Sequence, residues 1–190
     1  MNERVRCFGT GDELYERYHD EEWGRPLKLS DDERELFERL ALEGFQSGLS
    51  WITILRKRPA FRAAFADFAP DVVAEFDEGD VERLMSDVGI IRNRRKIEAT
   101  IANAKAIVAL HADGRRLMDL VAAHKPSDHV RPTTIAEPNT GASEATALAK
   151  ELKKLGFKFV GPTTMYALMQ AIGIVDDHAS DCWLGKSGLS

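Results

Sequence analysis

Glu43 is a charged residue on the apolar side of a predicted helix. It follows Leu40 by three positions and Leu36 by seven, which puts it at the edge of one hydrophobic stripe. Burying an unpaired carboxylate is costly, so such a side chain either has a partner in the core or binds a ligand. The residues alone leave both interpretations open.

Aromatic residues accompany this acid on both sides. Trp51 follows it closely, while Tyr15, Tyr18 and Trp23 lie upstream. A carboxylate among aromatic rings suits a cationic or flat heterocyclic ligand, because the face of a ring attracts a cation. These residues predict a binding box for such a group, and the alternative is a core with a salt-bridged glutamate.

The two cysteines of the chain each have a histidine nearby. Cys7 comes twelve residues before His19, and His178 comes four before Cys182, on one face if that segment is a helical turn. Two Cys and two His can form a closed tetrahedral Zn²⁺ site, which would join the two chain termini. The spacing is not that of a zinc finger, and the alternative is two unrelated buried thiols.

A glycine turn at Gly89 separates two predicted amphipathic helices. Arg92 lies in the turn, and Arg94 and Lys96 open the second helix. Backbone N–H groups in a tight turn and at a helix N-terminus can bind one phosphate while nearby cations hold its neighbours. Helix–hairpin–helix elements hold a DNA backbone in this way, and the alternative is a plain corner between two helices.

The charge distribution adds to this interpretation. The formal net charge is −5, which argues against a general polyanion binder. The acidic excess lies in residues 1–35, however, and residues 50–62 and 88–97 contain basic residues without any acidic one. Such stretches indicate local phosphate contacts, and the alternative is solvated helix faces.

The elements that must position these residues are helices. Apolar residues recur at helical spacing almost everywhere and no segment alternates with a period of two, so the sequence predicts an all-α fold. Residues 30–33 have the form of a capping box before the helix of Glu43. Ser50 is placed to cap the next helix, which we expect Pro59 to interrupt and restart.

Local signals predict where the later helices begin. Pro70 should open a short helix, and Asp80 and Asn93 should cap the two helices of the hairpin. Ser143 should cap another helix, and Pro162 should open the one after it.

The length of 190 residues fits a single unit. Residues 125–142 are rich in Pro, Ser and Thr and are expected to form an irregular connection. A connection of that length can separate two lobes. Residues 1–35 and 125–190 would then form a lobe with the zinc site, and residues 36–124 a lobe with the hairpin.

The composition is that of a globular protein, with 44% hydrophobic and 30% charged residues. No apolar stretch is long enough to span a membrane, and no apolar region marks a secretory signal. Two cysteines cannot make a disulfide scaffold. We therefore expect a cytoplasmic protein with reduced thiols.

Taken in order along the chain, these motifs resemble the family of 3-methyladenine DNA glycosylase I. The resemblance covers nearly the whole chain. Its motifs are Arg6-Cys7, Tyr15-x-x-Tyr18-His19-Asp20-x-x-Trp23-Gly24, Leu42-Glu43-Gly44-x-Gln46-x-Gly48-Leu49-Ser50-Trp51, Asp87-x-Gly89-Ile90-Ile91-Arg92-x-Arg94-x-Lys96-Ile97, Gly156-Phe157-Lys158-Phe159-Val160-Gly161 and Gly173-x-Val175-x-Asp177-His178-x-x-x-Cys182.

The resemblance implies a helix–hairpin–helix glycosylase fold whose termini are joined by one structural zinc. The implied zinc ligands are Cys7, His19, His178 and Cys182, and the implied base pocket consists of Glu43, Tyr18 and Trp51 with Tyr15 at its edge. Two positions depart from the family pattern. Phe8 is the one candidate for an aromatic expected after the first cysteine, and Phe45 replaces a polar residue.

The same resemblance implies a monomeric enzyme acting on double-stranded DNA that contains alkylated bases. It would flip 3-methyladenine into the pocket and hydrolyse the N-glycosidic bond, leaving an abasic site without strand cleavage. A catalytically silent helix–hairpin–helix protein that binds damaged DNA is one alternative. A zinc hydrolase is another, and it would need an open coordination position.

Overall fold

The computed structural model describes residues 4–27, 30–134 and 143–187. Every regular element in these ranges is a helix, which confirms the all-α prediction for this part of the chain. No described helix combines the length and apolar character needed to cross a membrane. The elements are α1 (Glu13–Glu21), α2 (Arg34–Gln46), α3 (Trp51–Ala64), the 3₁₀ turn η1 (Ala66–Phe68), α4 (Pro70–Ala74), α5 (Glu78–Ser86), α6 (Arg94–Ala112), α7 (Leu117–Ala123), α8 (Ser143–Lys154), α9 (Pro162–Ala171) and α10 (Trp183–Ser187).

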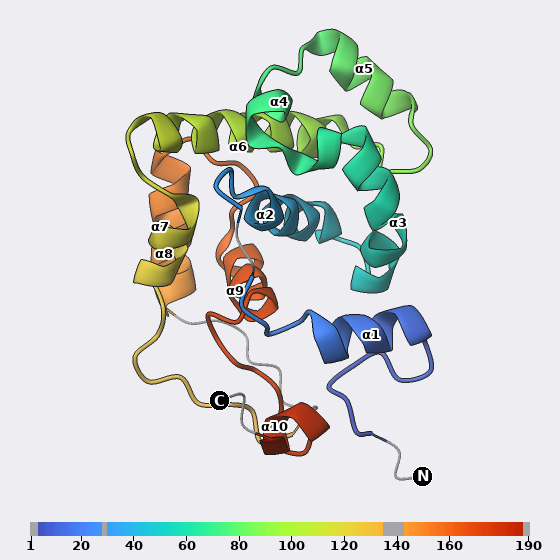
Figure 1. Ribbon diagram of the computed structural model, residues 1–190, viewed down its shortest axis with the longest axis vertical. Coiled ribbons are helices and arrows are strands. Elements are labelled where there is room, and N and C mark those ends of the chain that lie inside the picture. Colours follow the sequence, from blue (N-terminus) through green and yellow to red (C-terminus); the bar gives the residue numbers. More distant parts are fainter. Residues whose placement is uncertain (1–3, 28–29, 135–142, 188–190) are drawn as a thin grey trace.

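The central helix of the molecule is α2 (Figure 1). It contacts α3, α6 and α9, and residues 36–45 are buried without a break. In Figure 1, α6 crosses above α2 with α4 against it, and α9 lies below α2. A helix covered on all sides carries its charged residues into the interior, so Glu38, Arg39 and Glu43 are all buried.

Several helices begin where local signals place them. The Asn93 side chain accepts a hydrogen bond from the Lys96 backbone N–H at 3.2 Å, which caps α6 as predicted. Pro70 opens α4, Ser143 opens α8 and Pro162 opens α9. The described part of the irregular connection has no helix, and its residues 135–142 lie outside the described residues.

The predicted capping box at residues 30–33 is wrong. Glu33 adopts a left-handed backbone with φ of 57° before α2, and its side chain makes no cap bond to that helix. The carboxylate instead accepts hydrogen bonds from the backbone N–H groups of Leu117 and Met118, each at 2.8 Å. Glu33 therefore caps the first turn of α7, a helix distant in sequence.

Two other predicted boundaries also differ. Asp77 rather than Asp80 is the N-cap of α5, and Asp80 completes its capping box by accepting from the Asp77 N–H. Pro59 does not interrupt α3, which continues through it. Arg58 and Arg62, on either side of this proline, both bind Glu38 of α2, and these contacts hold the two halves of α3 in line.

Segments from opposite ends of the chain meet near α1 and α10 (Figure 1). The Trp183 backbone N–H donates to the Val5 carbonyl at 2.9 Å, and its indole Nε1 donates to Asp20 at 3.0 Å. The division into two lobes stays a prediction.

Candidate active site

A cavity lies between α1, α2, α3 and α9. Its volume is about 230 Å³, which suits one small heterocycle rather than a larger ligand. The four predicted pocket residues come from three helices and all line it. The lining consists of Phe8, Tyr15, Tyr18, Trp23, Glu43, Gln46, Trp51, Ala167 and Gln170.

Aromatic rings form most of the wall. The ring centroids of Tyr18 and Trp51 are 5.3 Å apart, and the Phe8 centroid lies 4.8 Å from that of Tyr15 and 5.1 Å from that of Trp23. Phe8 is thus placed in the wall, where the sequence offered it as the one aromatic candidate after Cys7. A flat group entering this cavity would meet π faces on more than one side.

Glu43 is the acidic group of the cavity. Its side chain is buried, with 6% of the residue exposed, and burial raises its pKa to about 8, although the positive charge of Arg39 lowers it somewhat. Among the described residues, none donates a hydrogen bond to its carboxylate. A carboxyl group with this pKa is mostly protonated near neutral pH, and it has an open place for a hydrogen-bonding ligand.

Trp51 presents a second unpartnered polar group. Its indole Nε1 is buried and has no hydrogen-bond partner in the described part of the chain. Buried donors are nearly always paired, so each exception calls for a reason. Trp51 and Glu43 offer one donor and one acid beside the same cavity.

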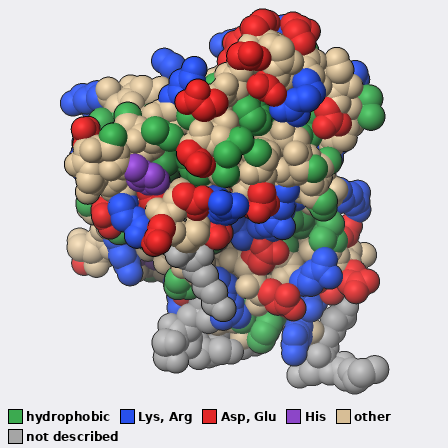
Figure 2. All heavy atoms as spheres, turned by 45° about the horizontal axis from the view of Figure 1, so that its top comes forward, with side chains coloured by type: hydrophobic (Ala, Val, Ile, Leu, Met, Phe, Trp, Pro, Cys, Tyr) green, Lys and Arg blue, Asp and Glu red, His purple; other side chains and the backbone are tan. Residues whose placement is uncertain are grey.

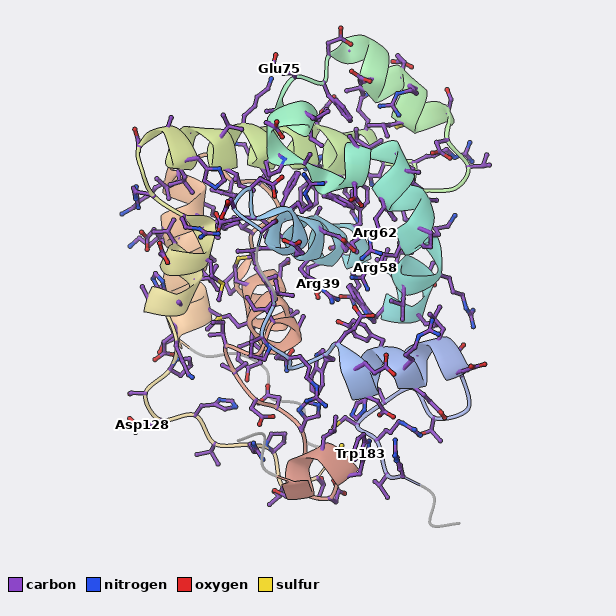
Figure 3. The ribbon with its side chains drawn as sticks, in the orientation of Figure 1. Arg39, Arg58, Arg62, Glu75, Asp128 and Trp183 are labelled. Carbon is purple, nitrogen blue, oxygen red and sulfur yellow. The ribbon has the colours of Figure 1, made fainter. Side chains whose placement is uncertain are left out.

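An ion-pair network supports the wall from behind. Arg39 of α2 and Arg58 of α3 each donate to Glu22 at 2.6 Å, and Arg58 and Arg62 both bind Glu38. Figure 3 shows these three arginines in the region between α1, α2 and α3. The network ties together the helices that carry the predicted pocket residues.

Arg39 also contacts the cavity wall directly. Its guanidinium carbon lies 5.5 Å from the centroid of the Tyr18 ring, on the ring face. Burial raises the pKa of the Tyr18 hydroxyl, so this group stays protonated. Sequence reasoning missed Arg39, because nothing local distinguishes it from an exposed arginine on α2.

The predicted metal ligands are only partly brought together. The ligand atoms of Cys7, His19 and Cys182 lie within 4.8 Å of one another. His178 lies beside this group, with its ring centroid 5.3 Å from that of His19. The turn from His178 to Cys182 is irregular rather than helical, because α10 begins only at Trp183.

The two histidines have the features of metal ligands. His178 Nε2 is buried without a partner among the described residues. The Nδ1 atoms of His19 and His178 lie 2.9 Å from Asp20 and 3.0 Å from Asp176, which orients both rings as carboxylates do beside metal-binding histidines. Burial lowers the pKa of both histidines, which favours the neutral form that binds a metal.

The Cys and His residues and the cavity share one wall. Trp23 lines the cavity and its ring lies 4.7 Å from that of His178, while Phe8 lies 5.0 Å from His19. Gly24 allows this approach, because a Cβ there would lie 2.5 Å from His178 Cε1. Any group that fixes these histidines also fixes the aromatic wall.

The residues predicted to contact phosphate lie in and after the turn between α5 and α6, and their surroundings differ. The Gly89 N–H donates to Asp87 at 2.7 Å, and Lys57 donates to the Gly89 carbonyl at 3.1 Å. Arg92 is exposed and has no ion-pair partner among the described residues. Arg94 is engaged by two acids of α5, Glu78 at 2.6 Å and Glu82.

Lys96 differs from the prediction most. It is buried, and its ammonium group donates to the carbonyls of Phe45 at 2.8 Å and Ser47 at 2.7 Å. It therefore satisfies carbonyls at the end of α2 and is not free to contact a phosphate. Figure 2 shows acidic and basic side chains interspersed over the visible face that includes α5 and α6.

Two further lining residues were not predicted. Ala167 and Gln170 lie three positions apart on α9 and both line the cavity. Their helical spacing alone looks like ordinary core packing. Phe45, which departs from the family pattern, does not line the cavity, and its ring packs 4.7 Å from that of Phe61 in the core.

Comparisons with known proteins agree over nearly the full chain. The family model described as methyladenine glycosylase matches residues 8–185. DNA-3-methyladenine glycosylase 1 of Escherichia coli is 49% identical over 181 residues, which is 93% of this chain and 95% of that protein.

Solved structures give the same result. A crystal structure of 3-methyladenine DNA glycosylase I aligns with a TM-score of 0.88 at 45% identity, covering 94% of this chain and 98% of the other. A variant of such an enzyme in complex with 3-methyladenine aligns with a TM-score of 0.84 at 38% identity, covering 96% and 97%. The chain therefore belongs to the methyladenine glycosylase family.

Proposed function

We propose that this protein is a monofunctional DNA glycosylase that hydrolyses the N-glycosidic bond of 3-methyladenine in alkylated double-stranded DNA. One observation carries the proposal: a cavity for a single heterocycle contains a buried carboxylate with no donor among the described residues. The family relatives named for this activity support it. We propose that the protein acts as a monomer in the cytoplasm.

The lesion supplies part of the chemistry. Adenine alkylated at N3 is cationic, so its bond to the sugar is already weakened. Extruding the nucleotide costs a few kcal/mol, and less for a base whose pairing is impaired. The faces of Tyr18 and Trp51 would then stabilise the cation by about 2 kcal/mol in a dry cavity.

Glu43 is the proposed reader of the charged base. A cation in the cavity favours the ionised carboxylate, which then accepts charge-assisted hydrogen bonds from the adenine edge. When the glycosidic bond breaks, its electron pair stays on the base, which leaves neutral. Water adds to the sugar carbon and loses a proton, which leaves an abasic site.

We propose that no strand cleavage accompanies base release. A lyase step needs an amine that attacks the sugar carbon, and no lysine lines the cavity. Lys96, the lysine nearest the hairpin turn in sequence, has its ammonium group bonded to two carbonyls. Borohydride treatment during the reaction should trap no protein–DNA adduct, and a trapped adduct would overturn this part of the proposal.

We propose that Cys7, His19, His178 and Cys182 hold one structural Zn²⁺. The unpartnered Nε2 of His178 supports this set. Four protein ligands leave no position for water, so the metal would supply folding stability and no reaction chemistry. The purified protein should contain one zinc per chain, and Cys182→Ser should lose both the zinc and several degrees of thermal stability. An absence of zinc with an unaffected variant would refute the site.

The hairpin is the proposed contact to the DNA backbone. Arg92 at the turn would meet a phosphate, with Arg94 contributing as far as its acidic neighbours allow. The Gly89 N–H would join this contact only by exchanging its bond to Asp87 for one to the phosphate. Lys96 would position the turn relative to α2 rather than bind DNA. Binding through these groups carries no sequence preference of its own.

The deciding experiment measures bases released from methylated duplex DNA by chromatography. Release of 3-methyladenine, with 7-methylguanine left in place, is expected. No release from a folded, zinc-containing protein would leave the alternative of a non-catalytic protein that binds damaged DNA. Full coordination of the zinc by protein ligands, checked by X-ray absorption, would exclude a zinc hydrolase.

A further inference from the structure

Gln170 brings a side-chain amide to the cavity from α9. It lines the cavity together with Ala167 of the same helix. An amide has one end that donates and one that accepts, so its effect on a ligand depends on which end faces inward.

Asp177 fixes the orientation of this amide. The Gln170 nitrogen Nε2 donates to Asp177 Oδ2 at 2.7 Å, and the same oxygen accepts from the Tyr166 hydroxyl at 2.7 Å. His129 Nε2 lies 2.7 Å from the other carboxylate oxygen. A carboxylate that receives these donors is an acceptor only, so the amide nitrogen must face it.

The carbonyl end of Gln170 is left for the cavity. None of the described residues donates a hydrogen bond to its Oε1. Gln46, the other amide in the lining, has no fixed partner for its side chain in the described part of the chain, so it can turn either end toward a ligand. Of the two amides, only Gln170 has a neighbour that fixes which end of its side chain faces the cavity.

We propose that Gln170 is a specificity-determining residue whose carbonyl oxygen accepts a hydrogen bond from the 6-amino group of the base, and that Asp177 is its positioning residue. A base with a carbonyl at C6 would place that oxygen against the carbonyl oxygen of Gln170. Two acceptors repel each other, so such a base would be rejected. This inference rests on the proposed function, because it takes an alkylated adenine as the ligand.

Two free bases that differ in the substituent at C6 test the idea, and the change in preference between variants cancels the additional ring N–H of the second base. 3-Methyladenine carries an amino group at C6, and 3-methylhypoxanthine carries a carbonyl there. Quenching of tryptophan fluorescence, with Trp23 and Trp51 in the wall, reports binding of either base without DNA. The wild-type protein should prefer 3-methyladenine by about tenfold or more.

Asp177→Asn should reverse the orientation of the amide. The new side chain offers an NH₂ group to which Gln170 can present its carbonyl, turning its own NH₂ into the cavity. The preference for 3-methyladenine should then fall about tenfold, with 3-methylhypoxanthine bound more tightly than by the wild type. A structural role for Asp177 would weaken both bases equally instead.

Two more variants complete the test. Gln170→Leu should lower the preference about tenfold even if Asp177→Asn fails to fold, and Glu43 should account for the preference that remains. Tyr166→Phe removes another donor to the same Asp177 oxygen but leaves Gln170 bound, and Tyr166 does not line the cavity, so the preference should be retained.

The outcomes separate this inference from the proposed function. If the wild-type protein binds and releases 3-methyladenine while Gln170→Leu keeps the full preference, only the inference is overturned. If the wild-type protein neither binds nor releases 3-methyladenine, the proposed function fails and the inference falls with it.

Discussion

The two ends of α2 carry two buried glutamates in opposite situations. Glu33, before the first turn, is fully buried and accepts hydrogen bonds from two backbone N–H groups. His111 Nε2 also lies 3.0 Å from its carboxylate oxygen Oε2. Glu43, near the last turn, is almost as buried and has no donor among the described residues. The first carboxylate is satisfied by the fold, while the second is the one that we propose a ligand satisfies.

We propose that the contrast extends to two indole nitrogens and to two cations of the hairpin, where a group that the fold pairs is structural and an unpaired one meets a ligand. Trp183 and Trp51 show it for indole nitrogens, since the first donates to Asp20 and the second has no partner in the described chain. Arg94 and Arg92 show it for cations of the hairpin.

The largest effect is expected from Glu43→Gln. Base release should fall about a hundredfold or more, because the carboxylate that meets the cationic base is gone. Binding to undamaged duplex DNA should change little. Single-turnover release of 3-methyladenine measures the loss, and activity equal to that of the wild type would remove Glu43 from the mechanism.

The same variant should change how stability depends on pH. The raised pKa of Glu43, about 8, means that the folded protein holds this proton more tightly than the unfolded chain does. Its contribution to stability is complete below the ordinary pKa near 4.5 and is lost as the pH rises through 8. Between pH 4.5 and 8, thermal melts should show the melting temperature of Glu43→Gln rising relative to that of the wild type. Parallel plots of melting temperature against pH for the two proteins would contradict the raised pKa.

Glu33→Gln should lower stability and spare base release, the reverse of what we expect for Glu43→Gln. Loss of the charge that caps α7 should lower the free energy of unfolding by about 1–3 kcal/mol in urea titrations. Release per folded molecule should be retained, because Glu33 does not line the cavity. A loss of release as large as that of Glu43→Gln would break the distinction between the two acids.

Trp51→Phe should have a smaller effect on release. The ring face remains while the unpartnered donor is lost, so release should fall about fivefold to tenfold with little change in stability. Trp183→Phe is the matched control. It removes a donor that the fold uses, so it should lower the melting temperature while release stays at the wild-type level.

The smallest effect is expected at the hairpin. Arg92→Ala should weaken binding to all DNA sequences a few-fold and reduce the slope of log affinity against log salt by about 1. Arg94→Ala should change the slope less, because Glu78 already pairs with this side chain. Equal slopes for both variants and the wild type would make the hairpin a plain corner.

Local signals in the sequence predicted well what depends on near neighbours. The Asn93 cap, the helix starts at Pro70 and Pro162 and the all-α class follow from bonds within a few residues. The pocket residues Glu43 and Trp51 were also predicted, because an acid inside an apolar stripe and a nearby indole are visible as sequence anomalies.

What failed depends on distant partners. Glu33 looked like part of a cap for its own helix, but the N–H groups it binds lie at Leu117 and Met118. Lys96 looked like a phosphate contact, and only the fold brings it to the carbonyls of Phe45 and Ser47. A pattern within one segment cannot show which remote backbone groups will need a donor or an acceptor.

The shared wall of the cavity has a consequence for protein synthesis. Phe8 and Trp23 are made well before Gln170 and His178, yet Phe8 and Gln170 line the same cavity and the Trp23 ring packs against that of His178. Such long-range contacts form only once both partners exist. A nascent chain that lacks the segment with Gln170 and His178 therefore has no complete cavity, and we expect it to excise no bases until that segment has been made.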